Sequence, residues 1–324
     1  MRAPEAAAVR PAPVRAGRGG PRGLARWLAP LLALVLAPML AQGAAAAPGA
    51  TLRLGIHNGL LSASPIEVDA MGQSIANQLG RIAGRHVSYE VNYGSPAIAR
   101  SLLEPGHFDL ALTRPGNLTA ALLAKGWRLL ANGRDPTQGV NFIARACPGK
   151  PGQVQLGGAT LQMVGVHNPP PETCVAVAEV WKSPAVRFLT AAKGSLVDLV
   201  TRRVVAEHGG VAADVLNTDT QTTVPDFMSM MQVAIIGAVS PHVSGQWAQQ
   251  GGVVVFHQPM PPLAILAAPG LAAETVAALR AGLADPGTAA VMGRALGIAG
   301  LDAPDPRPFE VFMRWLHAAA PAGH

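Results

Sequence analysis

Short apolar segments alternate with longer amphipathic ones along most of this chain of 324 residues, and this alternation restricts the fold more than any other feature. Runs such as 52–56, 109–113 and 233–239 have the length and aliphatic composition of buried strands. Strands separated by helices are joined by crossover connections, which place neighbouring strands parallel to one another. The sequence therefore predicts an α/β fold in which each sheet is mostly parallel and flanked by helices.

The clearest helical segment begins after Ser64. Ser64 is placed to cap the helix, Pro65 suits the first helical position, and Glu67 follows three residues after the cap, which together form a capping box. Gly84 suits the far end of the helix. Apolar residues at spacings of three and four define the predicted buried face, and they are Val68, Met71, Ile75, Leu79 and Ile82.

The alternation is interrupted by the Pro- and Gly-rich stretch 147–158 and then restarts. After the interruption we expect strands at 161–166 and 213–218, and a helix that begins near 172–173 and runs past Trp181. A pattern that starts twice indicates two α/β units.

The chain is long enough for two lobes of ordinary domain size. Segments 139–146 and 253–268 are the natural places for the chain to cross between them. We expect a first lobe formed by 47–140 and 258–324, and a second lobe formed by 141–257.

Residues 1–46 have the composition of a secretory signal peptide. Six arginines and one glutamate accompany the apolar run 24–41, and small residues follow it. An uncleaved N-terminal anchor is the alternative, but the run contains two prolines and is short for a membrane span. We therefore expect an exported protein.

The net charge depends strongly on this leader. The whole chain carries a formal charge of +6, and without the leader's arginines and glutamate the charge falls to +1. The remaining chain therefore has no basic excess of the kind that attracts nucleic acid, and we expect no nucleic-acid partner.

Cys147 and Cys174 are the only cysteines of the chain. An isolated pair in an exported protein usually forms a disulfide. A metal site or a catalytic thiol is the alternative, but the spacing fits no zinc pattern. We expect a disulfide between these two residues.

Motifs of common enzymes are absent from the sequence. It contains no GxSxG, no HExxH and no phosphate-cradling glycine loop. We expect no catalytic residues, no resident cofactor and no enzymatic activity.

A copper or other metal carrier is a second hypothesis, because imidazole and thioether groups are suitable ligands for copper. No HxH or HxxxH run supports it, and methionines on helices usually pack in cores. The residues that raise this hypothesis are His57, His167, His242, His257, Met228, Met230, Met231 and Met260.

Helices that open with Ser-Pro recur at 64–65, 95–96 and 240–241, each shortly after a predicted strand. In open α/β sheets, ligands bind at the carboxyl ends of the strands, where helix N-termini also favour anions. Ordinary helix capping is the alternative for each serine alone. Three such helix starts favour a site for a polar or anionic ligand.

Several segments resemble, in order and spacing, the phosphate/phosphonate-type periplasmic solute-binding proteins of ABC importers. In the first lobe these are LRLGI, the strand that ends at Tyr93, IARSLL and GHFDLALTRPGN; GRDPTQGVNFIAR and VVFHQPMPPLAILAAPGL resemble the family's two crossing segments. The similarity covers roughly residues 50–310.

The resemblance implies a two-lobed periplasmic-binding-protein-like fold with two crossing segments. It also implies a monomer in the periplasm that captures a small polar or anionic solute between its lobes, with a phosphonate- or phosphate-like oxyanion as the first guess. The lobes would close on the solute, and an inner-membrane ABC permease would be the partner. An accessory or sensory protein without a transport role is the alternative.

One departure weakens the phosphonate assignment. Such proteins usually carry a Ser-Thr-Ser-like cluster at the helix that opens the second lobe. The stretch that we match to it, 166–174, offers only Thr173 as a hydroxyl donor, and Glu172 would repel an anion.

Candidate ligand residues follow from the predicted strand ends and helix starts. Arg114 is the natural partner for a carboxylate or oxyanion, with an ordinary surface arginine as the alternative. The aromatic ring of Tyr93 could stack on a ligand or pack in the core. The full set is His57, Asn58, Ser64, Tyr93, Ser95, Thr113, Arg114, His167, Thr173, Thr218, Ser240 and His242.

Overall fold

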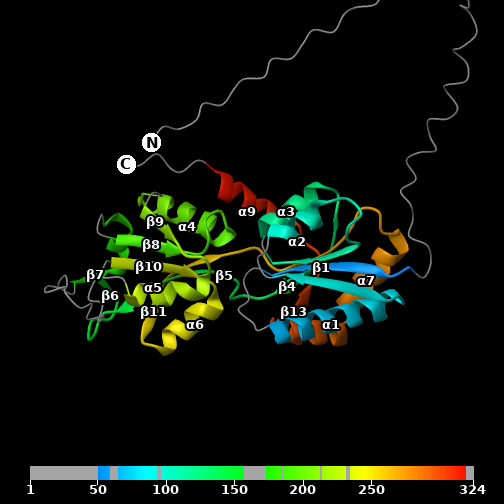
Figure 1. Cartoon of the computed structure of the whole chain (residues 1–324), viewed down its shortest axis with the longest axis horizontal. Coiled ribbons are helices and arrows are strands. Elements are labelled where there is room, and N and C mark those ends of the chain that lie inside the picture. Colours follow the sequence, from blue (N-terminus) through cyan, green and yellow to red (C-terminus); the bar gives the residue numbers. More distant parts are fainter. Residues whose placement is uncertain are drawn as a thin grey trace, which may run out of the picture. The chain divides into compact units, whose positions relative to one another are not determined.

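The computed structural model describes residues 50–58, 65–92, 96–114, 116–156, 173–183, 186–211, 214–230 and 234–318, and these form two mixed β-sheets with helices on their faces (Figure 1). The predicted signal peptide at 1–46 and the predicted strand at 161–166 lie outside the described residues.

The first sheet has the strand order β13-β4-β12-β3-β1-β2. β1 pairs in parallel with β2 and β3, whereas β12 and β13 pair antiparallel with their neighbours. The strands are β1 (Leu52–His57), β2 (Val87–Asn92), β3 (Leu110–Thr113), β4 (Arg128–Arg134), β12 (Ala264–Ala267) and β13 (Gly300–Asp302). The helices of this part are α1 (Pro65–Ala83), α2 (Pro96–Leu103), α3 (Gly116–Ala124), α7 (Ala273–Ala284), α8 (Pro286–Leu296) and α9 (Arg307–His317).

The second sheet has the order β7-β6-β5-β10-β8-β9, with β11 also paired to β5. β8 pairs in parallel with β9 and β10. The strands are β5 (Gly139–Ala146), β6 (Gln153–Leu156), β7 (Thr173–Ala176), β8 (Val186–Thr190), β9 (Val215–Asn217), β10 (Ala234–Val239) and β11 (Gly252–Pro259). Its helices are α4 (Leu196–Glu207), α5 (Val224–Met230) and α6 (Pro241–Gln249), with short 3₁₀ helices η1 (Val177–Lys182) and η3 (Gln221–Thr223).

The predicted class, an α/β fold with two lobes and two crossing segments, is confirmed. The sheets are mixed, however, and parallel pairing is confined to strands joined by helices. β4 leads to β5, and β11 to β12, through short segments without a helix, and all four of these strands pair antiparallel with their neighbours. These two connections lead from one sheet to the other, and the strands that they join are paired with strands running in the opposite direction, so mostly parallel sheets were too simple an expectation.

Both faces of each sheet are covered, which explains why the central strands are continuous apolar runs. On the first sheet, α1, α7 and α8 pack over one face and α2, α3 and α9 over the other. On the second sheet, α4 and η1 cover one face and α5 and α6 the other. The predicted core stripe of α1 is confirmed, since Val68, Met71, Ile75 and Leu79 are buried.

Buried Gln138 ties the two crossing segments together. Its backbone oxygen accepts from the amide of Met260 (3.2 Å), its Oε1 accepts from the amide of Leu263 (3.2 Å), and its Nε2 donates to the carbonyl of Pro261. The two crossings therefore form one hydrogen-bonded pair rather than two independent linkers.

The prediction of a helix from 172–173 past Trp181 is wrong. Residues 173–176 form β7, which pairs antiparallel with β6, and η1 follows. The run Thr-Cys-Val-Ala-Val is rich in β-branched residues, which favour a strand over a helix.

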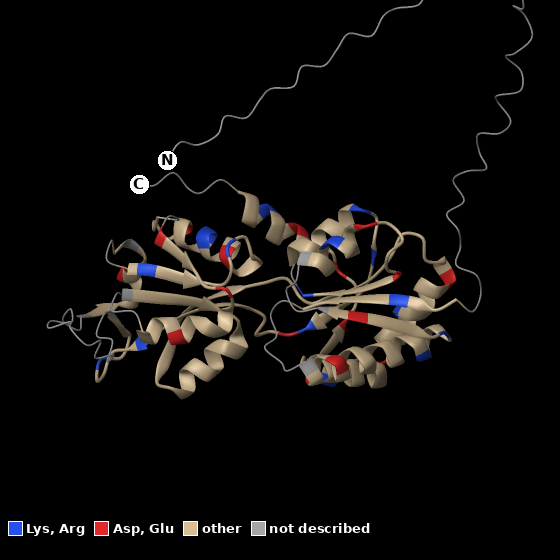
Figure 2. Cartoon of the chain, viewed as in Figure 1, with Lys and Arg blue, Asp and Glu red and all other residues tan. Residues whose placement is uncertain are grey.

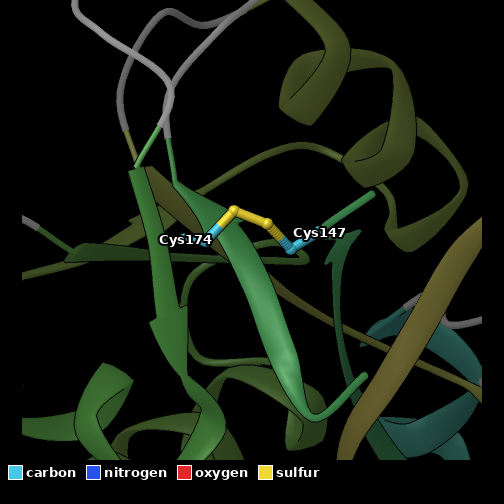
Figure 3. The surroundings of a disulfide bond; sticks show 2 residues. All are labelled: Cys147 and Cys174. Carbon is cyan, nitrogen blue, oxygen red and sulfur yellow. A yellow bond between two sulfur atoms is a disulfide. The ribbon is translucent and has the colours of Figure 1, made fainter. Parts of the chain in front are cut away.

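The predicted disulfide between Cys147 and Cys174 is confirmed. Cys147 follows β5 directly and Cys174 lies on β7, so the bond fixes the β6–β7 hairpin to the adjacent strand (Figure 3). In the part of the chain that the structure describes, no helix combines the length and the apolar character needed to cross a bilayer.

Candidate functional site

Polar side chains gather where β1 and β3 end. His57 pairs in register with Thr113, and the amide of Arg114 donates to the carbonyl of His57 (3.0 Å). Because the two strands are parallel and adjacent, their carboxyl ends meet at one edge of the sheet. The structure thus brings four predicted residues together: His57, Asn58, Thr113 and Arg114.

Arg114 forms a largely buried ion pair. Its Nη2 lies 3.2 Å from Oδ2 of Asp135, and the two side chains are 7% and 16% exposed. Burial lowers the pKa of Arg114, and the charge of Asp135 opposes that shift. Asp135 is in turn held by Thr137, whose amide (3.1 Å) and hydroxyl (2.7 Å) both donate to Oδ1. The guanidinium is therefore fixed in place and electrically balanced.

Four side chains in this cluster carry buried polar atoms without a hydrogen-bond partner among the described residues. They are Nδ1 of His57, both amide atoms of Asn58, Nε of Arg114, and Oδ1 of Asn117 in the first turn of α3. An unpartnered buried amide or hydroxyl costs about 1–3 kcal/mol, so native proteins rarely keep one without a use. Burial also lowers the pKa of His57 from its ordinary 6.5, so its imidazole is neutral at neutral pH.

The hydroxyl of Thr113 is not available in the same way. It is buried and hydrogen-bonded to the hydroxyl of Thr119 on α3 (2.7 Å). Thr113 therefore fixes α3 against the end of β3, and α3 in turn carries Asn117.

The second sheet presents a similar edge at the ends of β8, β9 and β10. Ser240 caps α6, is 1% exposed, and its Oγ has no partner among the described residues. Its amide donates to Oε1 of Gln221 (2.7 Å). The hydroxyl of Thr218, by contrast, is directed at the carbonyls of Thr190 (3.1 Å) and Thr220 (2.6 Å), so its hydrogen is committed to the backbone.

The N-terminus of α4 lies at this edge, after β8. A carboxylate in the first turn of the same helix, that of Asp198, supplies a negative charge there. Asp198 is 1% exposed and accepts from the amide of Gly194 (2.8 Å), from Nε of Arg202 (2.9 Å) and from Nδ2 of Asn217 (2.8 Å). Burial raises the pKa of Asp198, but these bonds outweigh it and hold the pKa below its usual range.

Other predicted residues are not brought to these edges. His242 is exposed on α6 and contacts Gln246 (3.3 Å). Thr173 lies in edge strand β7 and opens no helix. Ser64, Tyr93, Ser95 and His167 lie outside the described residues.

Sequence reasoning missed Asn117, Asp135, Gln221 and all of α4. The signal for α4 was present, because Ser195 and Asp198 repeat the serine and acidic spacing seen at Ser64 and Glu67. α4 is the helix after β8, the first strand of the second sheet that pairs in parallel with its neighbours, and 190–195 is the segment that joins them.

The metal-carrier hypothesis gains no support from the described residues. No three His, Cys, Asp or Glu side chains lie together there as a possible metal site. Met228 and Met260 are buried in apolar cores, and Nδ1 of His257 is hydrogen-bonded to Oδ1 of Asn141 (2.6 Å). His167 and Met231 lie outside the described part.

Comparison with known proteins gives matches in structure alone, since no family model and no curated protein sequence matches the chain. The chain is similar to PhnD1 of Prochlorococcus marinus in complex with methylphosphonate, with a TM-score of 0.58, 10% identity, and coverage of 82% of this chain and 96% of the other.

Two further structures give comparable scores. A binding protein component of an ABC phosphonate transporter from Pseudomonas aeruginosa has a TM-score of 0.56 at 11% identity, over 83% of this chain and 86% of that one. XAC2383 of Xanthomonas citri, bound to chloride, has a TM-score of 0.55 at 13% identity, over 82% and 97%. At such identities the likeness establishes the fold, and the chain therefore has the two-lobed fold seen in these solute-binding proteins.

Proposed function

We propose that this protein is a periplasmic solute-binding protein that captures one small polar solute. The observation that carries the proposal is the set of buried, unpartnered polar atoms at strand carboxyl ends in both sheets: His57 and Asn58 after β1, and Ser240 after β10. A bound solute would supply the missing hydrogen bonds. Such convergent polar groups, at the edge where α/β sheets bind ligands, are what a solute site requires.

The fold supports the same role. The solved structures named above include a transporter component, and a permease of the inner membrane is the partner that this likeness suggests. The sequence places the lobes at 47–140 with 258–324, and at 141–257, and the signal peptide at 1–46. Because β5 begins at Gly139 and β11 ends at Pro259, both in the second sheet, we propose that the boundaries lie a few residues away, in the segments 135–138 and 260–263. In this account the solute lies between the lobes, and affinity comes from hydrogen bonds without bond chemistry.

Movement of the lobes would be concentrated at the paired crossings. Residues 135–138 and 260–263 contain no helix or strand, and Gln138 joins them. Hinges of this kind absorb backbone rotation at a few residues between rigid elements. Asp135, which holds Arg114, lies at the start of the first crossing, so the hinge and the candidate site share a residue.

Replacing Asn58 with leucine tests the proposal. The side chain is fully buried and neither amide atom has a partner within the described part of the chain, so an apolar group of similar size should raise the free energy of unfolding by about 1–3 kcal/mol. The same change removes ligand contacts, so solute binding should be lost. Replacing a residue that is kept for function at a cost in stability typically raises stability and abolishes function together.

The measurement is thermal unfolding of the purified protein and of Asn58→Leu against a panel of phosphate, methylphosphonate, sulfonates, carboxylates, amino acids, amides and sugars. A solute at 100 times its dissociation constant stabilises by about 2.7 kcal/mol. Asn77→Leu, at an exposed position of α1, is the control and should change neither quantity. A panel without a single stabilising solute, or stabilisation that persists in Asn58→Leu, would contradict the proposal.

A further inference from the structure

We propose that the solute carries no net charge and presents N–H or O–H donors as well as acceptors, so that it is not a phosphonate-like oxyanion. This inference rests on the proposed function and concerns the same site. It follows from the charge balance of Arg114 and from the kinds of atom that are left without partners.

The arginine that would attract an anion is already paired. Oδ2 of Asp135 lies 3.2 Å from Nη2 of Arg114, and both side chains are shielded from solvent. Nε of Arg114 is a buried donor without a partner among the described residues, and a neutral carbonyl or hydroxyl oxygen could accept from it. An oxyanion at the same place would lie close to the carboxylate of Asp135. Like charges at such range repel strongly in a poorly solvated site, and the pair contributes no net charge to attract the anion.

The unpartnered atoms include acceptors that a fully ionised oxyanion cannot satisfy. Asn58 leaves both Oδ1 and Nδ2 unpartnered, so one acceptor needs a donor whichever way the amide is turned. Oδ1 of Asn117 is a second acceptor for which the described residues offer no partner. A fully ionised phosphonate or sulfonate has acceptor oxygens alone, whereas an amide, an amino acid or a sugar has donors too.

Among the described residues, the candidate site at the edge of the second sheet also has no unbalanced charge. At the N-terminal end of α4 the carboxylate of Asp198 accepts from the amide of Gly194, and the hydroxyl of Ser195 accepts from the amide of Asp198, so the helix end already has a negative charge beside it and one of its amides is capped. Ser240 offers a hydroxyl, which can donate or accept. The loop before α4 carries Lys193 and the segment after β9 carries Asp219, both exposed, so these opposite charges lie in solvent.

The distribution of charged residues over the chain is also consistent with a solute without net charge. Figure 2 shows acidic and basic residues interspersed over the described elements. Without residues 1–46, which we propose to be a signal peptide, the formal charge is +1. A field that concentrates anions at a cleft requires many charges of one sign, and residues 47–324 have no such excess.

The test is calorimetric titration of the protein with two sets of probes. The anions are methylphosphonate, phosphate and ethanesulfonate; the probes without net charge are acetamide, ribose, glycine and proline. We expect no anion to bind with a dissociation constant below about 1 mM. An anion that binds below about 0.1 mM would overturn the inference while leaving the proposed binding role intact.

Asp135→Asn tests the charge argument independently of the natural solute. The new Oδ1 keeps the bonds from Thr137, but the charge of Arg114 is no longer balanced. Affinity for methylphosphonate or phosphate should rise at least about tenfold over the parent, with the gain falling at high salt. Asp302→Asn, which removes the same charge from an exposed pair with Arg134, should give no gain.

The outcomes separate the two claims. An Asp135→Asn protein that folds without gaining anion affinity overturns the inference, because Asp135 is then not what balances the site. If this variant does not fold, the titrations of the parent decide alone. If no probe, neutral or charged, binds to the parent protein, the result counts against the proposed function. A gain of anion affinity in Asp135→Asn would still support a site without net charge.

Discussion

Arg114→Met should lower the free energy of unfolding by about 3 kcal/mol. The substitution leaves the carboxylate of Asp135 with its bonds from Thr137 but without the cation that compensates its charge, and that carboxylate is only 16% exposed. Removing one partner of a shielded ion pair is far more costly than the net worth of the pair, because the remaining charge stays desolvated. The measurement is the urea midpoint and slope at neutral pH, compared with the parent.

Two variants make this prediction specific. Arg134→Met breaks a pair with Asp302 whose side chains are 57% and 52% exposed, and it should cost no more than about 1 kcal/mol. The double change of Arg114→Met with Asp135→Asn should recover much of the loss, because no unpaired charge remains. An Arg114→Met protein as stable as Arg134→Met would show that the site does not shield its charges.

Replacing Cys147 and Cys174 together with serine should lower the free energy of unfolding by about 3.5 kcal/mol. The cysteines are 27 residues apart, and the cross-link removes the entropy of that loop from the unfolded chain. Because the bond fixes the β6–β7 hairpin beside β5, opening should begin there, as faster amide exchange over 153–156 and 173–176.

A reductant serves as the control for the disulfide. It should destabilise the parent by an amount close to the effect of the double serine variant, and it should leave that variant unchanged. A loss below about 1 kcal/mol would mean that the unfolded chain is already restricted in this region without the bond.

Local patterns predicted much of this fold. The core stripe of α1, the buried strands β1, β3 and β10, and the disulfide were all readable, because each depends on residues close in sequence or on composition. The opening of α6 at Ser240-Pro241 was readable for the same reason.

The rest depends on contacts that the sequence does not display. The β-branched residues of 173–177 favour a strand only weakly, and pairing with β6 and the disulfide, which the sequence does not display, complete β7. The ion pair between Arg114 and Asp135 connects the ends of β3 and β4, two strands that are not neighbours in the sheet. The predicted strand end identified Arg114 as a candidate, but the sequence could not show that Asp135 pairs with its charge.

The central claim is that one solute is held at strand ends in both sheets, and hydrogen–deuterium exchange of the protein tests it most directly. With the solute that gives the largest thermal shift, exchange should slow at 57–58, at 113–117 and at 239–241. Protection at both edges is the predicted result. Protection confined to one sheet, or a stabilising solute that protects neither edge, would contradict capture of one solute at these edges.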